Sequence, residues 1–594
     1  MKLWSIWALV LCIASTVWAQ NDKTIEVQNA DVLEVLETEG VSVRKLVGNV
    51  SLTQGNVTML CDSALLYYRE NNARIFGNVY IKQGDSVEIK SRRAFYNGNQ
   101  RKATFQQDVY LTDGKTKIYS DSLSYLVTNR KATLYNNVRL EDNRAKVKAN
   151  KVEYIVKTKQ AYLYDNVDLT ANDGTKIRTD KMDYNANTKQ VELYQNGQLK
   201  EKSGLEITSD RMSYNINSQE GSYANGGKLL NKETTLTSQK ATYRGMDKKV
   251  LFEEDVHLQT PEYSLHTPQL DYDIATEKAK FLGSSTITNA SGTIQANEGE
   301  YDAQNNSLTL NQRTTINQKE QQLTADNLVY DRKTGMTKAT GNVIWRDSKQ
   351  NLGINSQFLL VNNQEKTVLA YKDVLLTQLV DKDTLYITAD TLQSTNRPPD
   401  KAKGEKDTIK NIFAYRNVKI LKKDLQGVCG SLYYSTADST FRMFQQPVLW
   451  SESYQLYADT IWLFTERNKP KQIHLLSNAF MGNELQKGVY NQIKGQNVLG
   501  YFVNQKIHHV TATGNAESVY FVQDEKKAYT GVNKSAAGII NMSFTSDGKA
   551  DRVSYIAQPN AVFYPMSQVR VKDFILKGFE WKNQRRPLVL ADIL

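Results

Sequence analysis

The sequence is poor in the residues and motifs on which most enzymes and metal sites depend. Its 594 residues include only 5 histidines, 3 cysteines and 9 prolines. It contains no phosphate-binding glycine loop with Lys and Ser/Thr, no His-Glu-x-x-His and no Gly-x-Ser-x-Gly. We therefore predict that the protein is not an enzyme and that it has no catalytic residues, no metal site and no cofactor.

Long apolar runs are confined to the start of the chain. Lys2, an apolar run from Leu3 to Thr16 and a small-residue exit at Ala19 have the layout of a secretory signal peptide. We predict cleavage after Ala19, because a retained anchor needs roughly 20 apolar residues. Lipidation at Cys12 is a less favoured alternative, since Leu11 stands where a small residue is expected. No later run is long enough to cross a membrane as a helix, so we predict an exported protein without an integral membrane segment after cleavage.

Tyrosine, by contrast, is abundant, and much of it recurs at a fixed interval. Nine tyrosines follow one another at steps of 29 or 30 residues: Tyr96, Tyr125, Tyr154, Tyr184, Tyr214, Tyr243, Tyr272, Tyr301 and Tyr330. All but Tyr272 close a first signature in which a polar residue lies four positions earlier, as Asp121 does before Tyr125. A single globular core imposes no such period, so the sequence indicates a repeat protein.

A second signature, two polar or glycine residues followed by valine, comes about ten residues after several of these tyrosines. Its copies include Gly77-Asn78-Val79, Gln107-Asp108-Val109, Asn136-Asn137-Val138, Asp165-Asn166-Val167, Glu254-Asp255-Val256 and Gly341-Asn342-Val343. Apolar and polar residues alternate within a repeat with the strand period of two, and this phase slips by one near Asp121. We predict an all-β solenoid in which each repeat is a pair of antiparallel strands bent near Asp121 and its equivalents.

Two cysteines, Cys61 and Cys429, share one place in the repeat, just before the polar residue of the first signature. Other repeats carry Ser, Ala or Thr there, which indicates small buried side chains. A solenoid would hold the two cysteines far beyond the ~7 Å between Cα atoms that a disulfide allows. We predict no bridge between them.

The two signatures, polar-x-apolar-x-Tyr alternating with Gly-Asn-Val in a secreted all-β chain, resemble the OstA-like, LptA-type family of periplasmic lipopolysaccharide-transport proteins. The resemblance covers roughly residues 44 to 530 and is strongest from 77 to 345. It implies an elongated, twisted β-jelly roll, open along one side (a β-taco), with an apolar interior that takes lipid acyl chains. This chain would be a long, repeat-expanded member without the outer-membrane barrel of the family's translocon.

The resemblance also implies a function. The protein would be a non-enzymatic periplasmic bridge that carries lipopolysaccharide toward the outer membrane, binds the acyl chains of lipid A, contacts other transport proteins through edge strands and binds no nucleic acid. The candidates for the lipid groove are the apolar members of the two signatures: Leu123, Tyr125, Val138, Val152, Tyr154, Val167, Met182, Tyr184, Met212, Tyr214, Leu270, Tyr272, Leu328, Tyr330 and Val343. Ordinary packing of a solenoid core is the alternative interpretation of each residue.

We divide the chain into a signal peptide (1–19), an N-terminal lead-in (20–43), regular β repeats (44–395), an exposed insertion (396–410) and degenerate repeats with the C-terminal end (411–594). Two other functions stay open. The formal net charge of +11 suits an anionic partner without identifying it, and a β-solenoid scaffold or surface protein could bind a protein or glycan on its outer face. A β-helical polysaccharide-active enzyme would need carboxylates clustered on one rung, which the sequence does not locate.

Overall fold

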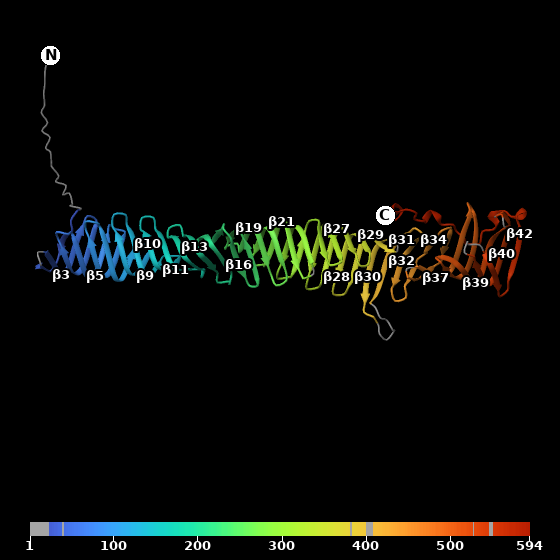
Figure 1. Ribbon diagram of the computed structural model, residues 1–594, viewed down its shortest axis with the longest axis horizontal. Coiled ribbons are helices and arrows are strands. Elements are labelled where there is room, and N and C mark those ends of the chain that lie inside the picture. The colour runs from blue at the N-terminus through green and yellow to red at the C-terminus, as the bar shows by residue number, and fades with distance from the viewer. Residues whose placement is uncertain are drawn as a thin grey trace, which may run out of the picture. The chain divides into compact units, whose positions relative to one another are not determined.

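The computed structural model describes residues 23–38, 41–290, 292–380, 383–399, 408–467, 469–524, 526, 528–545 and 550–594 (Figure 1). The predicted signal peptide and residues 400–407 of the predicted insertion lie outside these ranges. Within them the regular secondary structure consists of β-strands and four short 3-10 helices, without any α-helix. The prediction of an all-β fold is confirmed.

The chain forms two compact units. Unit 1 comprises the residues up to Pro261 together with Gln269–Ala275, and unit 2 comprises Glu262–Pro268 together with Thr276–Leu594. Strand β20 (Ser264–Asp273) has residues in both units.

Most strands of unit 1 are 10 to 14 residues long and follow one another along the chain (Figure 1). They are β1 (Glu26–Asn29), β2 (Val32–Thr38), β3 (Val41–Gln54), β4 (Val57–Tyr67), β5 (Asn72–Gln83), β6 (Val87–Asn97), β7 (Lys102–Thr112), β8 (Lys117–Leu126), β9 (Lys131–Glu141), β10 (Ala145–Ile155), β11 (Gln160–Ala171), β12 (Lys176–Asn185), β13 (Gln190–Lys200), β14 (Glu206–Asn215), β15 (Glu220–Tyr223), β16 (Gly227–Asn231), β17 (Thr234–Ser238), β18 (Lys240–Arg244) and β19 (Lys249–Gln259).

Unit 2 continues the same pattern with longer strands toward its end. They are β21 (Lys278–Asn289), β22 (Gly292–Asp302), β23 (Ser307–Leu310), β24 (Thr314–Gln318), β25 (Gln321–Ala325), β26 (Asn327–Asp331), β27 (Met336–Asp347), β28 (Leu352–Asn362), β29 (Thr367–Val380), β30 (Asp383–Arg397), β31 (Ile409–Lys422), β32 (Leu425–Ser435), β33 (Thr440–Phe444), β34 (Val448–Ser451), β35 (Tyr454–Tyr457), β36 (Thr460–Glu466), β37 (Lys469–Gln486), β38 (Val489–Val503), β39 (Lys506–Gln523), β40 (Tyr529–Phe544), β41 (Ala550–Ile556) and β42 (Asn560–Pro565). Four 3-10 helices follow in this described part: η2 (Met566–Gln568), η3 (Val571–Asp573), η4 (Asn583–Arg585) and η5 (Leu590–Asp592).

Neighbouring strands pair antiparallel in both units. Near the middle of the regular strands the register of this pairing shifts. Between β7 and β8 the register shifts between Gln106 and Val109. Gln107 and Asp108, with φ of 66° and 52°, together face Asp121 on the neighbouring strand. Two residues opposite one form a β-bulge, which bends the strand and increases its twist. The bend predicted near Asp121 is confirmed, and the second signature supplies its extra residue.

A hydrogen bond joins the two signatures at this bend. Asn137, with φ of 50°, donates from Nδ2 to Asp121 Oδ2 at 2.8 Å. In unit 2, Asn342 donates to Asp326 Oδ2 at the same distance of 2.8 Å. Asparagine adopts the left-handed conformation more readily than most residues. The asparagine therefore adopts the backbone conformation that the bulge requires, and its side chain also binds the facing aspartate.

The bends fold the sheet of unit 1 into two facing walls. Along β10, about ten residues or about 30 Å of extended chain separate Tyr154 from the turn beside Ala145. Tyr154 Oη nevertheless donates to Asp113 Oδ2, in the turn between β7 and β8, at 2.5 Å. A flat sheet would not allow this contact. We call the half-strands with the signature tyrosines, such as Val152–Ile155, the tyrosine wall, and those with the signature valines, such as Val138–Glu141, the valine wall.

The inner faces of the two walls form the core. In β10 the exposed fraction is 0% for Ala145 and Tyr154 and 1% for Val147 and Val152, whereas Lys148 between them is exposed. This alternation continues along the regular strands, with one face buried and the other facing solvent. Bent antiparallel strands around a common interior confirm the predicted β-jelly roll built from repeats of 29 or 30 residues.

In the last part of unit 2 the C-terminal segment, residues 566–594, covers the outer face of the valine wall. Leu449 faces the interior, so its neighbour Trp450 points outward, where the segment's Phe574 and Leu576 join the same buried cluster. Trp450 is fully buried there, with an exposed fraction of 0%. This part of the wall is apolar on both faces, as strands covered on both sides commonly are.

Buried glutamines fix the C-terminal segment to the wall. Gln492 donates to the carbonyl oxygen of Phe574 and accepts from the backbone N–H of Leu576, both at 2.9 Å. Further along the segment, Gln455 donates to the carbonyl oxygen of Glu580 at 2.7 Å and accepts from the backbone N–H of Lys582 at 2.6 Å. Arg586 donates from Nε and Nη2 to Gln426 Oε1, at 2.9 and 2.6 Å. The segment therefore crosses several strands and is held by side chains rather than by a backbone ladder.

Candidate functional site

Four inner tyrosines of unit 1 reach across the interior to the opposite rim. Each donates its hydroxyl to a polar side chain 41 or 42 residues earlier: Tyr96 to Gln54, Tyr125 to Gln83, Tyr154 to Asp113 and Tyr184 to Asp142. All four rings have exposed fractions of 1% or less. Burial raises the pKa of the Tyr96 hydroxyl to about 12, so it stays protonated and able to donate. The four acceptors lie at the strand ends of the valine wall. Each hydrogen bond therefore joins the rim of the valine wall to the rim of the tyrosine wall.

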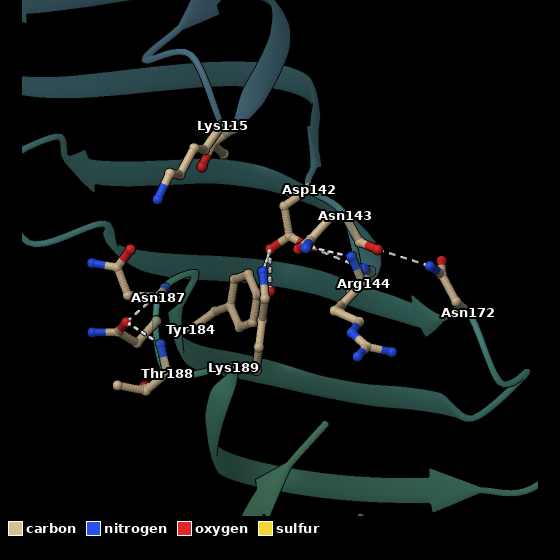
Figure 2. Close-up of polar contacts among 12 residues, drawn as sticks. Lys115, Asp142, Asn143, Arg144, Asn172, Tyr184, Asn187, Thr188 and Lys189 are labelled. Atoms are coloured by element: carbon tan, nitrogen blue, oxygen red, sulfur yellow. Dashed lines mark hydrogen bonds and ion pairs between the residues drawn. The ribbon is translucent and has the colours of Figure 1, made fainter. Parts of the chain in front are cut away.

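Cations from turns of the tyrosine wall complete two of these contacts. Figure 2 shows Lys189 beside Asp142, which also accepts the hydroxyl of Tyr184. The Lys189 Nζ lies 2.8 Å from Asp142 Oδ2, and the two side chains are 8% and 3% exposed. Lys159 forms the equivalent ion pair with Asp113. We call each tyrosine with its rim partners a latch.

Asp113 shows how such a latch controls a buried carboxylate. Burial by itself would raise the pKa of Asp113. Hydrogen bonds from Lys159, from Tyr154 and from the backbone N–H groups of Thr116 and Lys115 outweigh burial and hold the pKa below its ordinary value. The carboxylate is therefore ionised across the physiological range, and its charge is compensated within the latch.

Twelve of the predicted groove residues lie in unit 1 and three lie in unit 2. Fourteen of the 15 have exposed fractions of 3% or less, and Tyr330 is partly exposed. Leu328, Tyr330 and Val343 belong to unit 2 and the others to unit 1. A cavity of unit 1 lined by Met212 and Tyr223 has a volume of about 10 Å³, room for about one water molecule. With its latches formed, the interior of unit 1 is a packed core.

Unit 2 contains an open cavity of about 630 Å³ between its walls. Its lining comes from β28 to β39 and includes Leu352, Leu376, Ile387, Ile412, Leu432 and Leu449. Pockets of about 300–1,000 Å³ are typical of small-molecule and cofactor sites. The aliphatic lining suits an apolar chain.

Two of the repeats around the cavity lack the latch tyrosine, whereas Tyr434 keeps that repeat position and lines the cavity. Four residues after the aspartate of the first signature, the later repeats carry Ser394 after Asp390 and Leu463 after Asp459. Neither side chain has a phenol that could cross the interior and bond to the opposite rim. Leu463 instead lines the cavity. At these two described repeats the walls are therefore not joined by the tyrosine latch found in unit 1.

Polar groups form the rim of the cavity. The Lys422 Nζ lies 2.6 Å from Asp424 Oδ1 and 3.7 Å from Asp383 Oδ2. Lys410 donates to Gln350 Oε1 at 2.7 Å. An apolar floor with a charged rim can hold an amphiphile, whose chain needs shelter from water while its head does not.

Sequence reasoning placed the groove candidates in the most regular repeats and missed this cavity. The open space lies where the tyrosine motif fades, so a search for motif copies passes over it. The available signal was the replacement of latch tyrosines by short or aliphatic residues at 394 and 463, combined with many Leu and Ile at inward positions.

Comparisons with known proteins match roughly the N-terminal half of the chain to two families. A family model described as OstA-like protein matches residues 22–180 and 164–268, and a model described as lipopolysaccharide-assembly, LptC-related, matches residues 222–317. Over residues 22–317, this chain is an OstA/Lpt-type family protein. The matched residues end before the open cavity, whose lining runs from Gln350 to Ile507.

The structural comparison finds similarity to LptH, the LptA-homologous periplasmic component of the lipopolysaccharide transport device of Pseudomonas aeruginosa. The sequence identity is 17% and the TM-score 0.18, and the match covers 18% of this chain and 82% of LptH. No curated protein matches the chain. Among the described residues, no helix has the length and apolarity needed to cross a bilayer.

Proposed function

We propose that this protein is a non-enzymatic periplasmic carrier that shelters the acyl chains of lipopolysaccharide on their way toward the outer membrane. The observation that supports this most directly is the apolar cavity of about 630 Å³ between the two walls of unit 2. The relationship to OstA-like and LptC-related families supports the same role.

Shelter is the physical requirement for such transport. Exposing an acyl chain of roughly a dozen methylenes to water costs about 10 kcal/mol, at about 0.8 kcal/mol per methylene. Leu376, Leu432 and Leu449 offer an aliphatic surface in its place. Burial of this kind requires no catalytic group, so the protein acts by binding alone.

The latches of unit 1 give this function a second state. In the interior of unit 1, Tyr125 and Tyr154 are 1% and 0% exposed and pack within the core. A chain can enter there only if the tyrosine–rim bonds open and the walls separate. We therefore propose that unit 2 receives acyl chains in the conformation described here and that unit 1 admits them after its latches open.

Contacts with other lipopolysaccharide-transport proteins would use the N-terminal edge of unit 1. Strand β2 pairs with β3 and presents Val32, Leu33, Val35 and Leu36, which are 43–60% exposed. Exposed apolar edge strands readily pair with a strand of another chain. A transport partner that adds a strand here would cover them.

Site-specific photocrosslinking in cells tests the proposal with matched tyrosine positions. A photoreactive phenylalanine replaces Tyr434, which lines the cavity, or Tyr415, which is 42% exposed on the outer surface of unit 2. We expect lipopolysaccharide adducts at 434 and none at 415. A third probe at Tyr154 reports whether the latched interior of unit 1 also receives lipid.

The outcomes separate the candidate functions. Adducts at 434 alone support a carrier whose unit 1 is closed, and adducts at 434 and 154 support a carrier in which both units open. Adducts at 415 alone would point to a scaffold that binds glycan on its outer face. Absence of adducts at all three positions, in exported and folded protein, would overturn the proposal.

A further inference from the structure

The cavity of unit 2 contains a lysine, Lys410, that has no ion-pair partner within the part of the chain that the structure describes. Lys410 lies near the start of β31, two residues before Ile412 and on the same inward face, and both line the cavity. Its Nζ has a hydrogen bond of 2.7 Å to Gln350 Oε1. Among the described residues, Lys410 takes part in no ion pair within 4.0 Å. An ammonium group has three donors, so two of them are available to a ligand.

The neighbouring charges explain why Lys410 differs from Lys422, another lysine that lines the cavity. Lys422 is compensated by Asp383 and Asp424. Asp347, the acidic residue that acts on Lys410, already accepts from Gln321 Nε2 at 3.1 Å and from the backbone N–H of Gln350 at 2.9 Å. It therefore acts on Lys410 only from a distance.

Burial also works against the charge of Lys410. Desolvation lowers the pKa of its ammonium group, and the carboxylate of Asp347 only partly opposes this effect. A cation that is partly removed from water is stabilised when an anion is placed against it. The position next to an aliphatic cavity determines what else such an anion must carry.

We propose that Lys410 is the headgroup subsite of this cavity and that it selects amphiphiles whose acyl chain bears an acidic headgroup. This inference rests on the proposed acyl-binding function and adds the chemical class of the ligand and its orientation. The acidic group lies against the Lys410 ammonium and the Gln350 amide, and the chain extends over Leu376, Leu432 and Leu449. Lys410 thus determines specificity, while the aliphatic lining provides the apolar contact.

Two probes of equal chain length separate the contribution of charge from that of the chain. Isothermal titration of the full chain below the critical micelle concentration compares decyl phosphate with the neutral decyl glucoside. We expect the wild-type protein to bind decyl phosphate at least tenfold more tightly, since hydrogen bonds between ions are about twice as strong as neutral ones. Lys410→Met should lower the affinity for decyl phosphate about tenfold and leave that for decyl glucoside within about twofold.

Two further variants keep the test falsifiable. Lys410→Arg retains the charge and should retain the preference for phosphate, which also excludes a general loss of folding. Lys534→Met removes one charge from an exposed position on β40, outside the cavity, and should change neither affinity. Equal binding of both amphiphiles that Lys410→Met leaves unchanged would overturn the inference and preserve acyl binding. Binding of neither amphiphile by the wild-type protein would overturn the proposed function itself.

Discussion

The hydroxyl of Tyr154 lies 2.5 Å from a carboxylate oxygen of Asp113, a residue 41 positions earlier in the chain. Tyr154 ends a strand of the tyrosine wall, and Asp113 belongs to a turn of the valine wall. Their bond therefore closes the side of unit 1 that lies opposite the bends. Lys159 joins the same carboxylate from a neighbouring turn, so one acidic group connects three strand ends.

Acid should weaken unit 1 through this carboxylate. The pKa of Asp113 is held below its ordinary value in the folded protein, so its contribution to stability is present above the unfolded pKa of about 3.9 and is lost as pH falls through the folded pKa. Asp113→Asn should lower the free energy of unfolding at pH 7 by about 3 kcal/mol, because it leaves Lys159 without its partner. It should also remove part of the decline in stability below about pH 4. Urea unfolding followed by tyrosine fluorescence at several pH values measures both effects.

Asp108→Asn provides the matched control for this acid effect. Asp108 pairs with Arg92 at 2.5 Å, but the two side chains are 70% and 72% exposed. Exposed ion pairs contribute about 0–1 kcal/mol, so this substitution should change the free energy of unfolding by less than 1 kcal/mol. If both variants lose the same stability at pH 7, the latch does not stabilise unit 1 in the way we describe.

The bulge predicts different effects for two substitutions of one asparagine. Asn137 has φ of 50° and bonds to Asp121 at 2.8 Å. Asn137→Ala loses the hydrogen bond and also the polar side chain that makes the left-handed conformation more accessible to asparagine than to alanine, which together should cost about 1–2 kcal/mol. Asn137→Gly loses the same bond without the backbone strain and should be about 1 kcal/mol more stable than the alanine variant. Equal unfolding free energies for the two variants would show that backbone conformation does not govern this position.

The local features of this fold could be predicted from the sequence because they repeat. Tyr125 and Tyr154 follow the period, and the phase slip near Asp121 indicates the bend. Cys61 and Cys429 share a repeat position, and both are buried and free. Local strand period and turn chemistry determine each of these features, so one repeat carries the information for all of them.

The long-range contacts could not be predicted in this way. The acceptor of the latch is glutamine at position 83 and aspartate at position 113, so no constant residue marks it. The cavity lies where two repeats replace the latch tyrosine, at positions 394 and 463, and Lys410 has no repeated counterpart that would single it out. The contact between Gln492 and Phe574 joins residues 82 positions apart and occurs at one place in the chain. Such contacts depend on how the walls face each other in space.

Gln492 should control the attachment of the C-terminal segment. Its side chain is 1% exposed and satisfies two backbone groups of the segment. Gln492→Ala leaves those buried groups unpaired, at a cost of about 1–3 kcal/mol each. Trypsin should then cleave at Lys577 at least tenfold faster, since about 1.4 kcal/mol changes an opening equilibrium tenfold. Gln486→Ala, an exposed position on β37, is the control, and similar cleavage rates for both variants would contradict this role of Gln492.

The two cysteines should report on the two units separately. Cys61 lies in unit 1 and Cys429 in unit 2, and burial raises the pKa of each thiol to about 12. At pH 8 the thiolate population is then about three orders of magnitude below that of a free cysteine, so both should label slowly in the folded protein.

With Cys12 replaced by serine, each remaining thiol should label once urea opens its own unit. Asp113→Asn should lower the urea midpoint for Cys61 and not for Cys429, whereas Gln492→Ala should lower that for Cys429 and not for Cys61. Mass spectrometry of the labelled peptides measures each midpoint, and equal shifts at both cysteines in either variant would mean that the two units unfold together.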